Sequence, residues 1–343
     1  MSSPLVSVCI PAYGRPHELY EALLSVLTQD FEDFEVVVGD DSGELKEVVF
    51  SIGDSRIRYL GNPIRLGMAG NWSSTLDNAR GRYRALLMDD DVLLPGFLSA
   101  TVQALEADSS VGIAFTDHYL DIAGVQQQRG CSLTGGRYED GVGMILHHQP
   151  VAVSAALMRF EVWDQVRPLP DLLNADLVMH LRAADAGWAF FYIDAPLMAY
   201  RVHAGQLTSQ EARFRGDLVR AWELFEFRDV EHEALRQRFL ASALIARAAT
   251  HLKAGEGEQA RATAARARTL VPRPSLREAL VVALARNPSI SPPVLRAWGM
   301  IHRMRQRRPF DELRSFGRLS SVLRRLLASN APSSDRGTAR GGK

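Results

Sequence analysis

The sequence has little cysteine, no long apolar segment and no excess of either charge, and each of these narrows the class of protein. Its two cysteines, Cys9 and Cys131, offer no disulfide framework, which favours a reducing compartment. No apolar run approaches the roughly 20 residues that cross a bilayer. The first residues hold no basic segment leading into an apolar one, so we expect no signal peptide and a cytoplasmic location. Lys and Arg together number 40, as do Asp and Glu, so net charge indicates no nucleic-acid partner.

What the sequence does contain is the composition of a globular protein with room for a sizeable core. Hydrophobic residues make up 46% and charged residues 23% of the 343 positions, which is typical of folded domains. This length accommodates two domains, or one large α/β domain with an appendage. The charge is uneven along the chain, since arginines concentrate between Arg296 and Arg325 while only Asp311 and Glu312 lie among them as acids.

Short apolar runs alternate with helix-like spacing up to about residue 200, which predicts an α/β fold. The segment "VSVCIPAY" is typical of a buried strand, and Leu19, Leu23 and Val26 follow it at helical spacing. The run Val36–Val38 is too short for a helix and indicates a strand covered on both faces. Further strands are expected at 56–63, 82–88, 112–117, 151–157 and 189–193, and further helices at 69–79, from Pro95 onward and at 175–186.

From about residue 213 the chain changes to helices dominated by Ala, Leu and Arg, which predicts an all-helical C-terminal extension. Residues 241–274 have the helix, Gly turn and Ala-rich helix of one tetratricopeptide-like unit. Stacked repeats need at least three such units, so we predict a single helical hairpin. The final polar residues are expected to be disordered.

Three consecutive carboxylates, Asp89, Asp90 and Asp91, lie between the predicted fourth strand and the next helix. One is expected as a helix N-cap, but adjacent like charges repel by about 1 kcal/mol at 4 Å even in bulk water. Either the cluster is a solvated turn or it collects a cation. Mg²⁺ and Mn²⁺ take one or two carboxylates together with substrate phosphates and water.

The pair Asp40 and Asp41 ends the predicted second strand and also has two interpretations. It is an Asx-type turn, or it belongs to the same site as the acidic triplet. Ligands of parallel α/β sheets sit beyond the carboxyl ends of the strands, where both acidic clusters are predicted to lie.

Four segments together resemble, in order and spacing, the family 2 glycosyltransferases with the GT-A fold. These are "VSVCIPAYGRP", "LLSVLTQDFEDFEVVVGDDSG", "GMAGNWSSTLDNARGRYRALLMDDDVLLP" and "YRVH". The resemblance covers roughly residues 5–205 and is specific, because several unrelated motifs recur in sequence. It implies a GT-A type mixed, mostly parallel sheet flanked by helices, and an inverting, nucleotide-sugar-dependent transferase.

The resemblance also implies a donor site. The residues that it assigns to the nucleotide-sugar are Pro11, Ala12, Tyr13, Arg15, Asp41, Asn71, Asp89 and Arg201. The first three would flank the nucleobase, with Tyr13 stacking on it, while Asp41 would bond the base edge and Asp89 would face the ribose. Asn71 falls, with Arg80, in the segment that family members fold over the nucleotide.

The implied cofactor is a divalent cation, Mn²⁺ or Mg²⁺, that bridges the donor's diphosphate. Asp90 would be its chief ligand, Asp91 a second one, and His203 in "YRVH" a further one near the diphosphate. Met88 stands where many members have their first Asp, so the choice among the three carboxylates stays open.

The family's base lies in an acidic pair that opens a helix, with an Arg six residues later. "NADLVMHLR" offers Asp176 and Arg182, although Ala175 replaces the common Glu. An ionised carboxylate there would take the proton of the acceptor hydroxyl as it attacks the anomeric carbon. The alternative for Asp176 is a first-turn helix acid favoured by the helix dipole.

The resemblance implies transfer of a sugar from a UDP- or dTDP-sugar to an acceptor hydroxyl in bacterial polysaccharide, glycolipid or glycosylated-metabolite synthesis. A nucleotidyltransferase acting on sugar phosphates is one alternative, but "PAYGRPHE" has a single Gly where a phosphate loop is expected. A non-catalytic interaction subunit is another, and it would be expected to have broken acidic motifs.

The implied organisation is a nucleotide-sugar-binding half at 1–116, an acceptor-side half at 117–212, the helical extension at 213–328 and a disordered tail at 329–343. The acceptor could be a saccharide, a lipid-linked sugar or a small molecule. The basic helices of the extension could contact an anionic membrane, which would place the protein at the inner face of the membrane. Alternatively they pack on the catalytic domain or form a homodimer.

Overall fold

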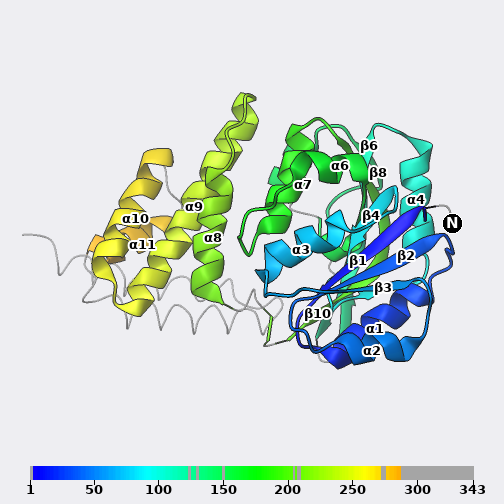
Figure 1. Ribbon diagram of the computed structural model, residues 1–343. Helices are drawn as coiled ribbons and strands as arrows, with labels where there is room; N and C mark the ends of the chain where they lie inside the picture. The colour runs from blue at the N-terminus through cyan, green and yellow to red at the C-terminus, as the bar shows by residue number, and fades with distance from the viewer. Residues whose placement is uncertain are drawn as a thin grey trace, which may run out of the picture. The chain divides into compact units, whose positions relative to one another are not determined.

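In the part of the chain that the structure describes, a mixed sheet of ten strands forms the centre of the fold, in the order β3-β2-β1-β4-β9-β6-β10-β5, with β7 on β6 and β8 on β10 (Figure 1). The computed structural model describes residues 3–122, 125–128, 131–148, 151–203, 205–206, 210–271 and 276–286, which all belong to one compact unit, Met1–Pro288. The strands are β1 Val6–Ala12, β2 Phe34–Asp40, β3 Ile57–Gly61, β4 Tyr83–Leu86, β5 Val92–Leu93, β6 Val111–Ile122, β7 Val125–Gln128, β8 Gly136–Tyr138, β9 Ala156–Arg159 and β10 Ala189–Val202.

Helices connect most of these strands. They are α1 Pro16–Leu27, α2 Lys46–Ile52, α3 Gly67–Asp77, α4 Phe97–Ala107, α5 Gly141–His148, α6 Phe160–Val166, α7 Ala175–Asp185, α8 Glu211–Glu223, α9 Val230–Ala254, α10 Gly257–Leu270 and α11 Leu276–Arg286, with a short 3₁₀ turn η1 at Val153–Ala155. β1 pairs in parallel with β2 and β4, and β6 with β10. β9 is antiparallel to β4 and β6. The predicted fold class, a mixed and mostly parallel sheet flanked by helices, is confirmed.

The first strands are buried on both faces, as their continuous apolar runs predict. Val8 and Ile10 of β1 pack in a core shared with Leu23 of α1. Cys9, between them, points to the other face, where its thiol contacts the carbonyl of Thr75 in α3. Figure 1 accordingly shows α1 and α2 on one side of β1–β3 and α3 on the other. Because successive side chains of a strand point to opposite faces of the sheet, β1 packs against the helices on both faces.

Three local predictions are wrong. α4 begins at Phe97 after Gly96, whose φ of 91° is left-handed, so Pro95 is not its first residue. The two-residue strand β5 follows the acidic triplet and pairs with β10, so none of the three carboxylates caps a helix. The strand expected at 151–157 begins only at Ala156, because η1 precedes it.

The helical hairpin predicted in the extension is confirmed. α9 ends at Gly255, whose φ of 80° provides a left-handed C-cap, and α10 starts at Gly257. In the described part of the chain, none of the helices combines the length and the apolar character needed to span a bilayer. The basic segment from Arg296 onward and the predicted tail at 329–343 lie outside the described residues.

Candidate functional site

The predicted donor-site residues gather at the carboxyl ends of three adjacent parallel strands. β1 lies between β2 and β4, so Tyr13 after β1, Asp41 after β2 and the acidic triplet after β4 share one edge of the sheet. The link is direct, because the backbone N–H of Tyr13 donates to Asp89 Oδ2 at 3.0 Å. Pro11 and Ala12 are buried within β1. They therefore shape the strand end beneath Tyr13.

The three carboxylates of the triplet have different surroundings, although they are adjacent in sequence. Arg15 Nη1 donates to Asp89 Oδ1 at 3.0 Å and to Asp90 Oδ2 at 2.5 Å. His203 Nε2 lies 3.0 Å from the same oxygen of Asp90. Burial raises the pKa of Asp89 to about 6, against the opposing effect of Arg15. Two cationic or protonatable groups thus converge on Asp90.

Asp91 points into the protein. The residue is only 1% exposed. Ser154 Oγ donates to Asp91 Oδ2 at 2.6 Å, and the backbone N–H of Arg201 donates to Asp91 Oδ1 at 3.2 Å. Burial, reinforced by the charge of Asp90, raises the pKa of Asp91 to about 8. Ser154 Oγ also accepts the N–H of Met88 at 3.1 Å. Asp91 therefore ties the triplet to η1 and to the end of β10.

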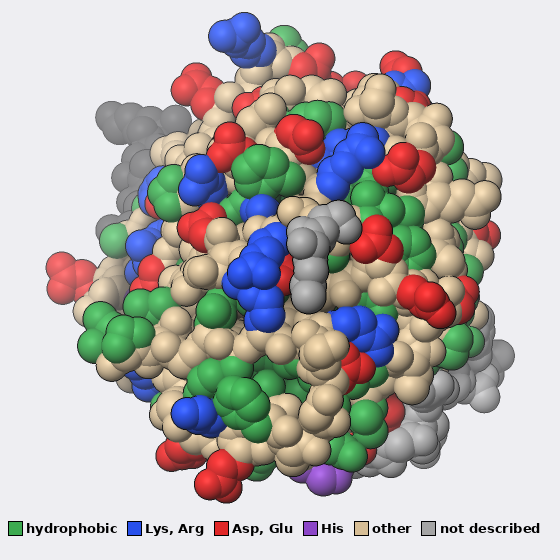
Figure 2. All heavy atoms as spheres, turned by 45° about the vertical axis from the view of Figure 1, so that its right-hand side comes forward, with side chains coloured by type: hydrophobic (Ala, Val, Ile, Leu, Met, Phe, Trp, Pro, Cys, Tyr) green, Lys and Arg blue, Asp and Glu red, His purple; other side chains and the backbone are tan. Residues whose placement is uncertain are grey.

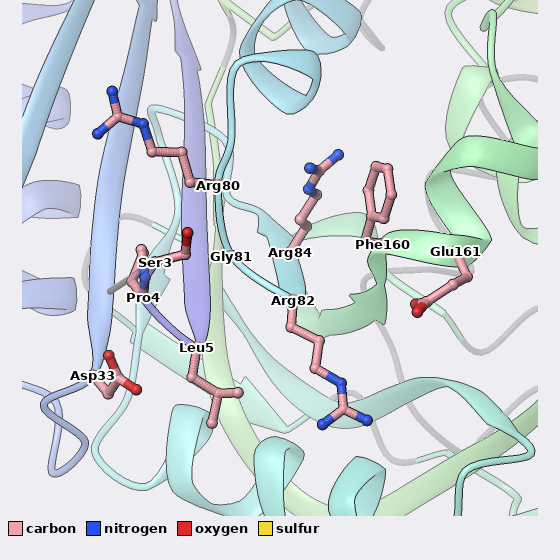
Figure 3. Close-up of a pocket in the computed structure, with 10 residues that line it drawn as sticks. All are labelled: Ser3, Pro4, Leu5, Asp33, Arg80, Gly81, Arg82, Arg84, Phe160 and Glu161. Carbon is pink, nitrogen blue, oxygen red and sulfur yellow. The ribbon is translucent and has the colours of Figure 1, made fainter. Parts of the chain in front are cut away.

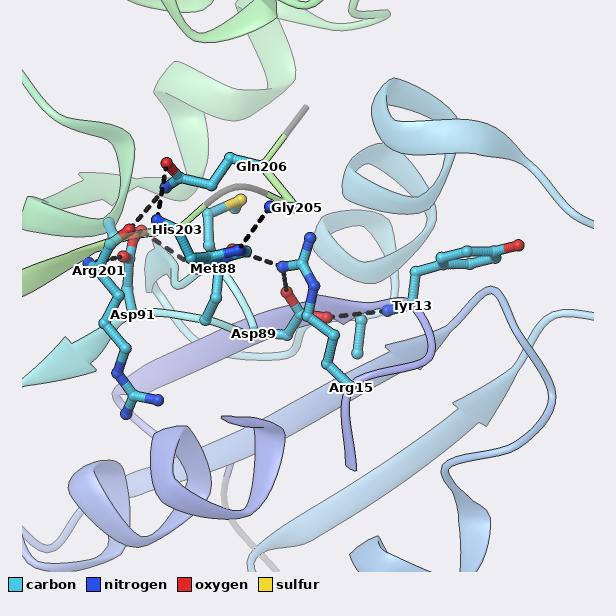
Figure 4. A network of polar contacts seen from close by, with 12 residues as sticks. Tyr13, Arg15, Met88, Asp89, Asp91, Arg201, His203, Gly205 and Gln206 are labelled. Carbon is cyan, nitrogen blue, oxygen red and sulfur yellow. Dashed lines mark hydrogen bonds and ion pairs between the residues drawn. The ribbon is translucent and has the colours of Figure 1, made fainter. Parts of the chain in front are cut away.

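At the end of β10, the imidazole of His203 faces the site, whereas the guanidinium of Arg201 points away from it. Arg201 pairs through its side chain with Glu21 of α1 at 2.6 Å, and Figure 4 shows it directed away from the other labelled residues. The N–H of Gly205 donates to His203 Nδ1 at 3.2 Å. With Nδ1 accepting, the ring proton is on Nε2, which donates to Asp90. Sequence reasoning placed Arg201 on the nucleotide-sugar, whereas in the structure its backbone supports Asp91.

Asp41 and Asn71 organise the loop between β3 and α3. Asp41 accepts hydrogen bonds from the N–H groups of Leu66 and Gly67 at 2.7 and 2.9 Å and from Asn62 Nδ2 at 3.1 Å. Asn71 is buried, with Nδ2 donating to the carbonyl of Gly39 at 2.9 Å. Both side chains are thus engaged by the chain itself.

Tyr13 presents its ring outward beside this loop. The residue is 49% exposed, and its ring points away from the acidic residues (Figure 4). The guanidinium of Arg65 lies 4.4 Å from the ring centroid. Arg65 and Ser154 also belong to this group of residues, but the sequence motifs do not identify them. "NPIRLG" and "VAVSAAL" contain no motif that singles either residue out.

Asp176 lies in the first turn of α7, where the backbone N–H groups of Leu177 and of Asp176 itself approach its carboxylate. Burial raises its pKa, and these two N–H groups act in the opposite direction. Within the described residues no other side chain pairs with this carboxylate. Arg182, its expected companion, instead donates to the carbonyls of Val166 and Pro168, both at 2.7 Å. The structure shows no hydrogen bond joining Asp176 to the acidic triplet.

Among the neighbouring side chains of the acidic triplet, Asp90 is the one best suited to bind a divalent cation. Asp90 offers oxygen atoms on which positive groups already converge, whereas both oxygens of Asp91 are engaged and the Nε2 of His203 carries a proton. In the described ranges no cluster of three or more His, Cys, Asp and Glu side chains is arranged to hold a metal ion. Mg²⁺ and Mn²⁺ need only one or two protein carboxylates when substrate phosphates complete the shell.

A pocket of about 410 Å³ opens at the other edge of the sheet, where β1 and β4 begin. It is lined by Ser3, Pro4, Leu5, Asp33, Arg80, Gly81, Arg82, Arg84, Phe160 and Glu161. Figure 3 shows the three arginine side chains pointing in different directions. Arg82 pairs with Glu106 at 3.1 Å, and Arg84 lies over the Phe160 ring at 4.3 Å. The guanidinium groups do not converge on one ligand, and Arg80 lies here, away from the acidic triplet.

The surface in Figure 2 mixes both charges. Lys and Arg side chains are interspersed with Asp and Glu and with hydrophobic groups across this face. It shows no uniformly basic stripe of the kind that follows nucleic-acid phosphates. This agrees with the balanced charge of the whole sequence.

Comparison with known sequences identifies one family and several curated relatives. Residues 7–165 match the family model described as glycosyl transferase family 2. The GalNAc(5)-diNAcBac-PP-undecaprenol beta-1,3-glucosyltransferase of Campylobacter jejuni is 40% identical over 105 residues, which are 29% of this chain and 34% of that protein. The UDP-Glc:alpha-D-GlcNAc-diphosphoundecaprenol beta-1,3-glucosyltransferase WfaP of Escherichia coli is 27% identical over 213 residues, 60% of this chain and 81% of that protein. The chain thus spans about a third of the first relative's length and most of the second's.

Solved structures share the fold at low sequence identity. The structure of residues 1–349 of S. aureus TarS in complex with UDP-GlcNAc aligns with a TM-score of 0.64 at 16% identity, covering 86% of this chain and 91% of that one. The mannosyltransferase PcManGT from Pyrobaculum calidifontis, in complex with GDP-Man and Mn²⁺, aligns with a TM-score of 0.54 at 17% identity, covering 87% and 83%. At these identities the likeness establishes the fold.

Proposed function

This chain is a member of glycosyl transferase family 2 through its residues 7–165, and we propose that it is an inverting transferase that moves a sugar from a UDP- or dTDP-sugar to an acceptor hydroxyl. The observation that carries the proposal is the hydrogen bond from Tyr13 N–H to Asp89 at 3.0 Å. It joins an exposed aromatic ring and the acidic triplet in one site at the ligand-binding edge of the sheet.

The donor's nucleoside is proposed to lie against Tyr13, with its diphosphate toward Asp90. The exposed ring offers a stacking surface for a base, and Asp89, next to it, faces the ribose. UDP donors are supported by relatives, since the Escherichia coli WfaP name specifies UDP-Glc and the TarS structure contains UDP-GlcNAc. Arg15 lies between the nucleoside end and Asp90, where its guanidinium can reach the diphosphate.

We propose Asp90 as the protein ligand of a Mn²⁺ or Mg²⁺ ion. When bound, that ion would neutralise negative charge that grows on the departing diphosphate. Asp91 has a supporting role here, because its oxygens hold Ser154 and the backbone of Arg201. The Nε2–H group of His203 points toward the same region, where it can donate a hydrogen bond to a phosphate oxygen.

Asp176 is proposed as the general base. Its carboxylate has no partner side chain among the described residues, which leaves it available for an acceptor hydroxyl. It would take that proton while the oxygen attacks the anomeric carbon on the face opposite the diphosphate, so the configuration inverts. The raised pKa makes this carboxylate a stronger base than an ordinary aspartate.

The proposed acceptor is a sugar linked to a lipid diphosphate, in polysaccharide synthesis. Both sequence relatives quoted above have undecaprenol-linked sugars in their names. Such an acceptor would bring the protein to the inner face of the membrane without a spanning helix. Flotation with anionic liposomes, with and without residues 294–343, tests this contact, and equal flotation of both forms would exclude a membrane role for the basic C-terminal segment.

The direct test is a screen of nucleotide sugars with the full chain and Mn²⁺, measuring release of the nucleoside diphosphate with and without a lipid-diphosphate-linked sugar. We expect a UDP- or dTDP-sugar to be turned over, with inversion visible by NMR of the product. Release of pyrophosphate from a nucleoside triphosphate and a sugar phosphate would instead identify a nucleotidyltransferase. Absence of nucleotide binding altogether would indicate a non-catalytic subunit.

A further inference from the structure

An arginine that no motif identifies covers one face of the exposed ring at the donor site. Arg65 lies in the loop between β3 and α3, with its guanidinium 4.4 Å from the centroid of the Tyr13 ring. Its side chain is exposed, and among the described residues it has neither an ion-pair partner nor a side-chain hydrogen bond. A cation that could extend into water is instead placed on this ring.

The loop that carries Arg65 is fastened on both sides. Asp41 accepts the N–H groups of Leu66 and Gly67, which follow Arg65 directly, at 2.7 and 2.9 Å. On the other side Asn62 donates to Asp41 at 3.1 Å and to Asn71 Oδ1 at 3.0 Å. Gly67 has a φ of 75°, a backbone conformation that glycine adopts without strain. The backbone position of Arg65 is therefore set by Asp41 and Asn71.

This arrangement indicates a role for Asp41 and Asn71 that the burial of their side chains does not by itself reveal. Neither presents free polar groups outward, yet both lie at the donor edge and both hold the same loop. The side chain that this loop delivers to Tyr13 is that of Arg65. With one face of the ring covered by the guanidinium, the ring is restrained and its opposite face is left for a flat ligand.

We propose that Arg65 is a positioning residue for the donor's base: it holds the Tyr13 ring by a cation–π contact, so that a nucleobase stacks on the other face. The inference rests on the proposed function, which places the nucleoside at Tyr13. Cation–π contacts at exposed sites contribute enough to change affinity by about two- to fivefold.

The test measures UDP and UMP binding by calorimetry for the wild type, Arg65→Ala, Tyr13→Leu and the double variant. Arg65→Ala should weaken binding of both nucleotides by the same factor, about two- to fivefold, because the contact acts on the base. In the Tyr13→Leu background the same substitution should have no further effect. Arg65→Lys, which keeps the charge but not the flat guanidinium, should fall between the wild type and alanine.

Arg56→Ala is the matched control, since the guanidinium of Arg56, the residue before β3, lies over the Phe34 ring at the same 4.4 Å. It should leave UDP affinity unchanged. Arg65 is exposed, so its alanine variant should keep the wild-type melting temperature.

Two results would overturn the inference. The first is a loss for Arg65→Ala that is confined to UDP or persists without Tyr13, which would mean that Arg65 contacts the nucleotide directly and does not act through the ring. The second is an unchanged affinity for both nucleotides. If the wild type itself binds neither UDP nor dTDP, the proposed function fails, which is distinct from failure at Arg65 alone.

Discussion

Arg15 and His203, which are far apart in the sequence, meet at one oxygen atom of Asp90, at 2.5 Å and 3.0 Å. Arg15 directly precedes α1 and His203 follows β10, so this carboxylate links the start of α1 to the end of β10. Neighbouring Asp91 makes no such contact and is held inside by Ser154. Asp90 is therefore the carboxylate of the triplet best placed to exchange one cation for another.

Replacing Asp90 with asparagine is expected to abolish the metal dependence of nucleotide binding. The amide keeps the shape but loses the charge that attracts Mn²⁺, so the gain in UDP affinity on adding Mn²⁺ should fall at least about tenfold, the lower limit for groups that merely support a metal. Calorimetry with Mn²⁺ and with EDTA measures this gain. Asp33→Asn, an exposed acid in the pocket at the other sheet edge, is the control. Equal UDP binding by the wild type in Mn²⁺ and in EDTA would contradict the assignment.

Asp176→Asn is expected to retain donor binding and lose transfer. Removal of a general base lowers turnover by about 10²- to 10⁴-fold, while the UDP affinity stays within about twofold. Since burial raises the pKa of Asp176, the acid limb of the wild-type kcat profile should lie at higher pH than for an ordinary aspartate, because the base works only when ionised. Asp185→Asn at the end of the same helix should leave turnover unchanged. Normal turnover by Asp176→Asn would exclude it as the base.

Much of the site could be predicted from the sequence because its residues follow recognisable strands. The apolar runs of β1 and β2 set where Tyr13 and Asp41 emerge, and parallel pairing then brings both to the edge that holds the triplet. The role of Asp91 could not be predicted, because it depends on Ser154, which is distant in sequence and lies in a turn expected to be strand. The two-residue strand β5 was missed for a similar reason, since its pairing partner is β10.

Arg201 shows a second limit of motif reasoning. The position matches the family pattern, but the motif does not say whether the backbone or the side chain acts. Local geometry at the end of β10 sends the guanidinium to Glu21 and leaves the N–H for Asp91. Side-chain direction in the site is thus a property of the packed fold.

The buried imidazole of His180 in α7 is expected to make stability fall in mild acid. Burial lowers its pKa to about 4, and its Nε2 has no partner within the described residues. Because the unfolded value is about 6.5, the unfolded chain binds the additional proton between these two values. The contribution of His180 to stability should therefore be constant above pH of about 6.5 and fall by about 3 kcal/mol as the pH drops to about 4.

His180→Leu should remove this part of the pH dependence, because the leucine has no proton to bind. Urea denaturation at a series of pH values measures the difference, and His17→Leu, on an exposed position of α1, provides the matched control. An unchanged pH profile in His180→Leu would show that the imidazole is not buried in its neutral form.

Arg15→Gln is expected to increase Mn²⁺ affinity in the absence of nucleotide. The guanidinium contacts Asp90 at the oxygen proposed for the metal, so the two cations compete for one position. Loss of a positive charge at contact distance is worth at least about 1 kcal/mol, which corresponds to about fivefold tighter Mn²⁺ binding, measured by electron paramagnetic resonance of the free ion. The same variant should bind UDP more weakly, since Arg15 is the cation available to the diphosphate. Arg58→Gln, which disrupts a comparable pair with Glu35 away from the triplet, should change neither affinity. Weaker Mn²⁺ binding by Arg15→Gln would mean that the guanidinium organises the metal site and does not compete for it.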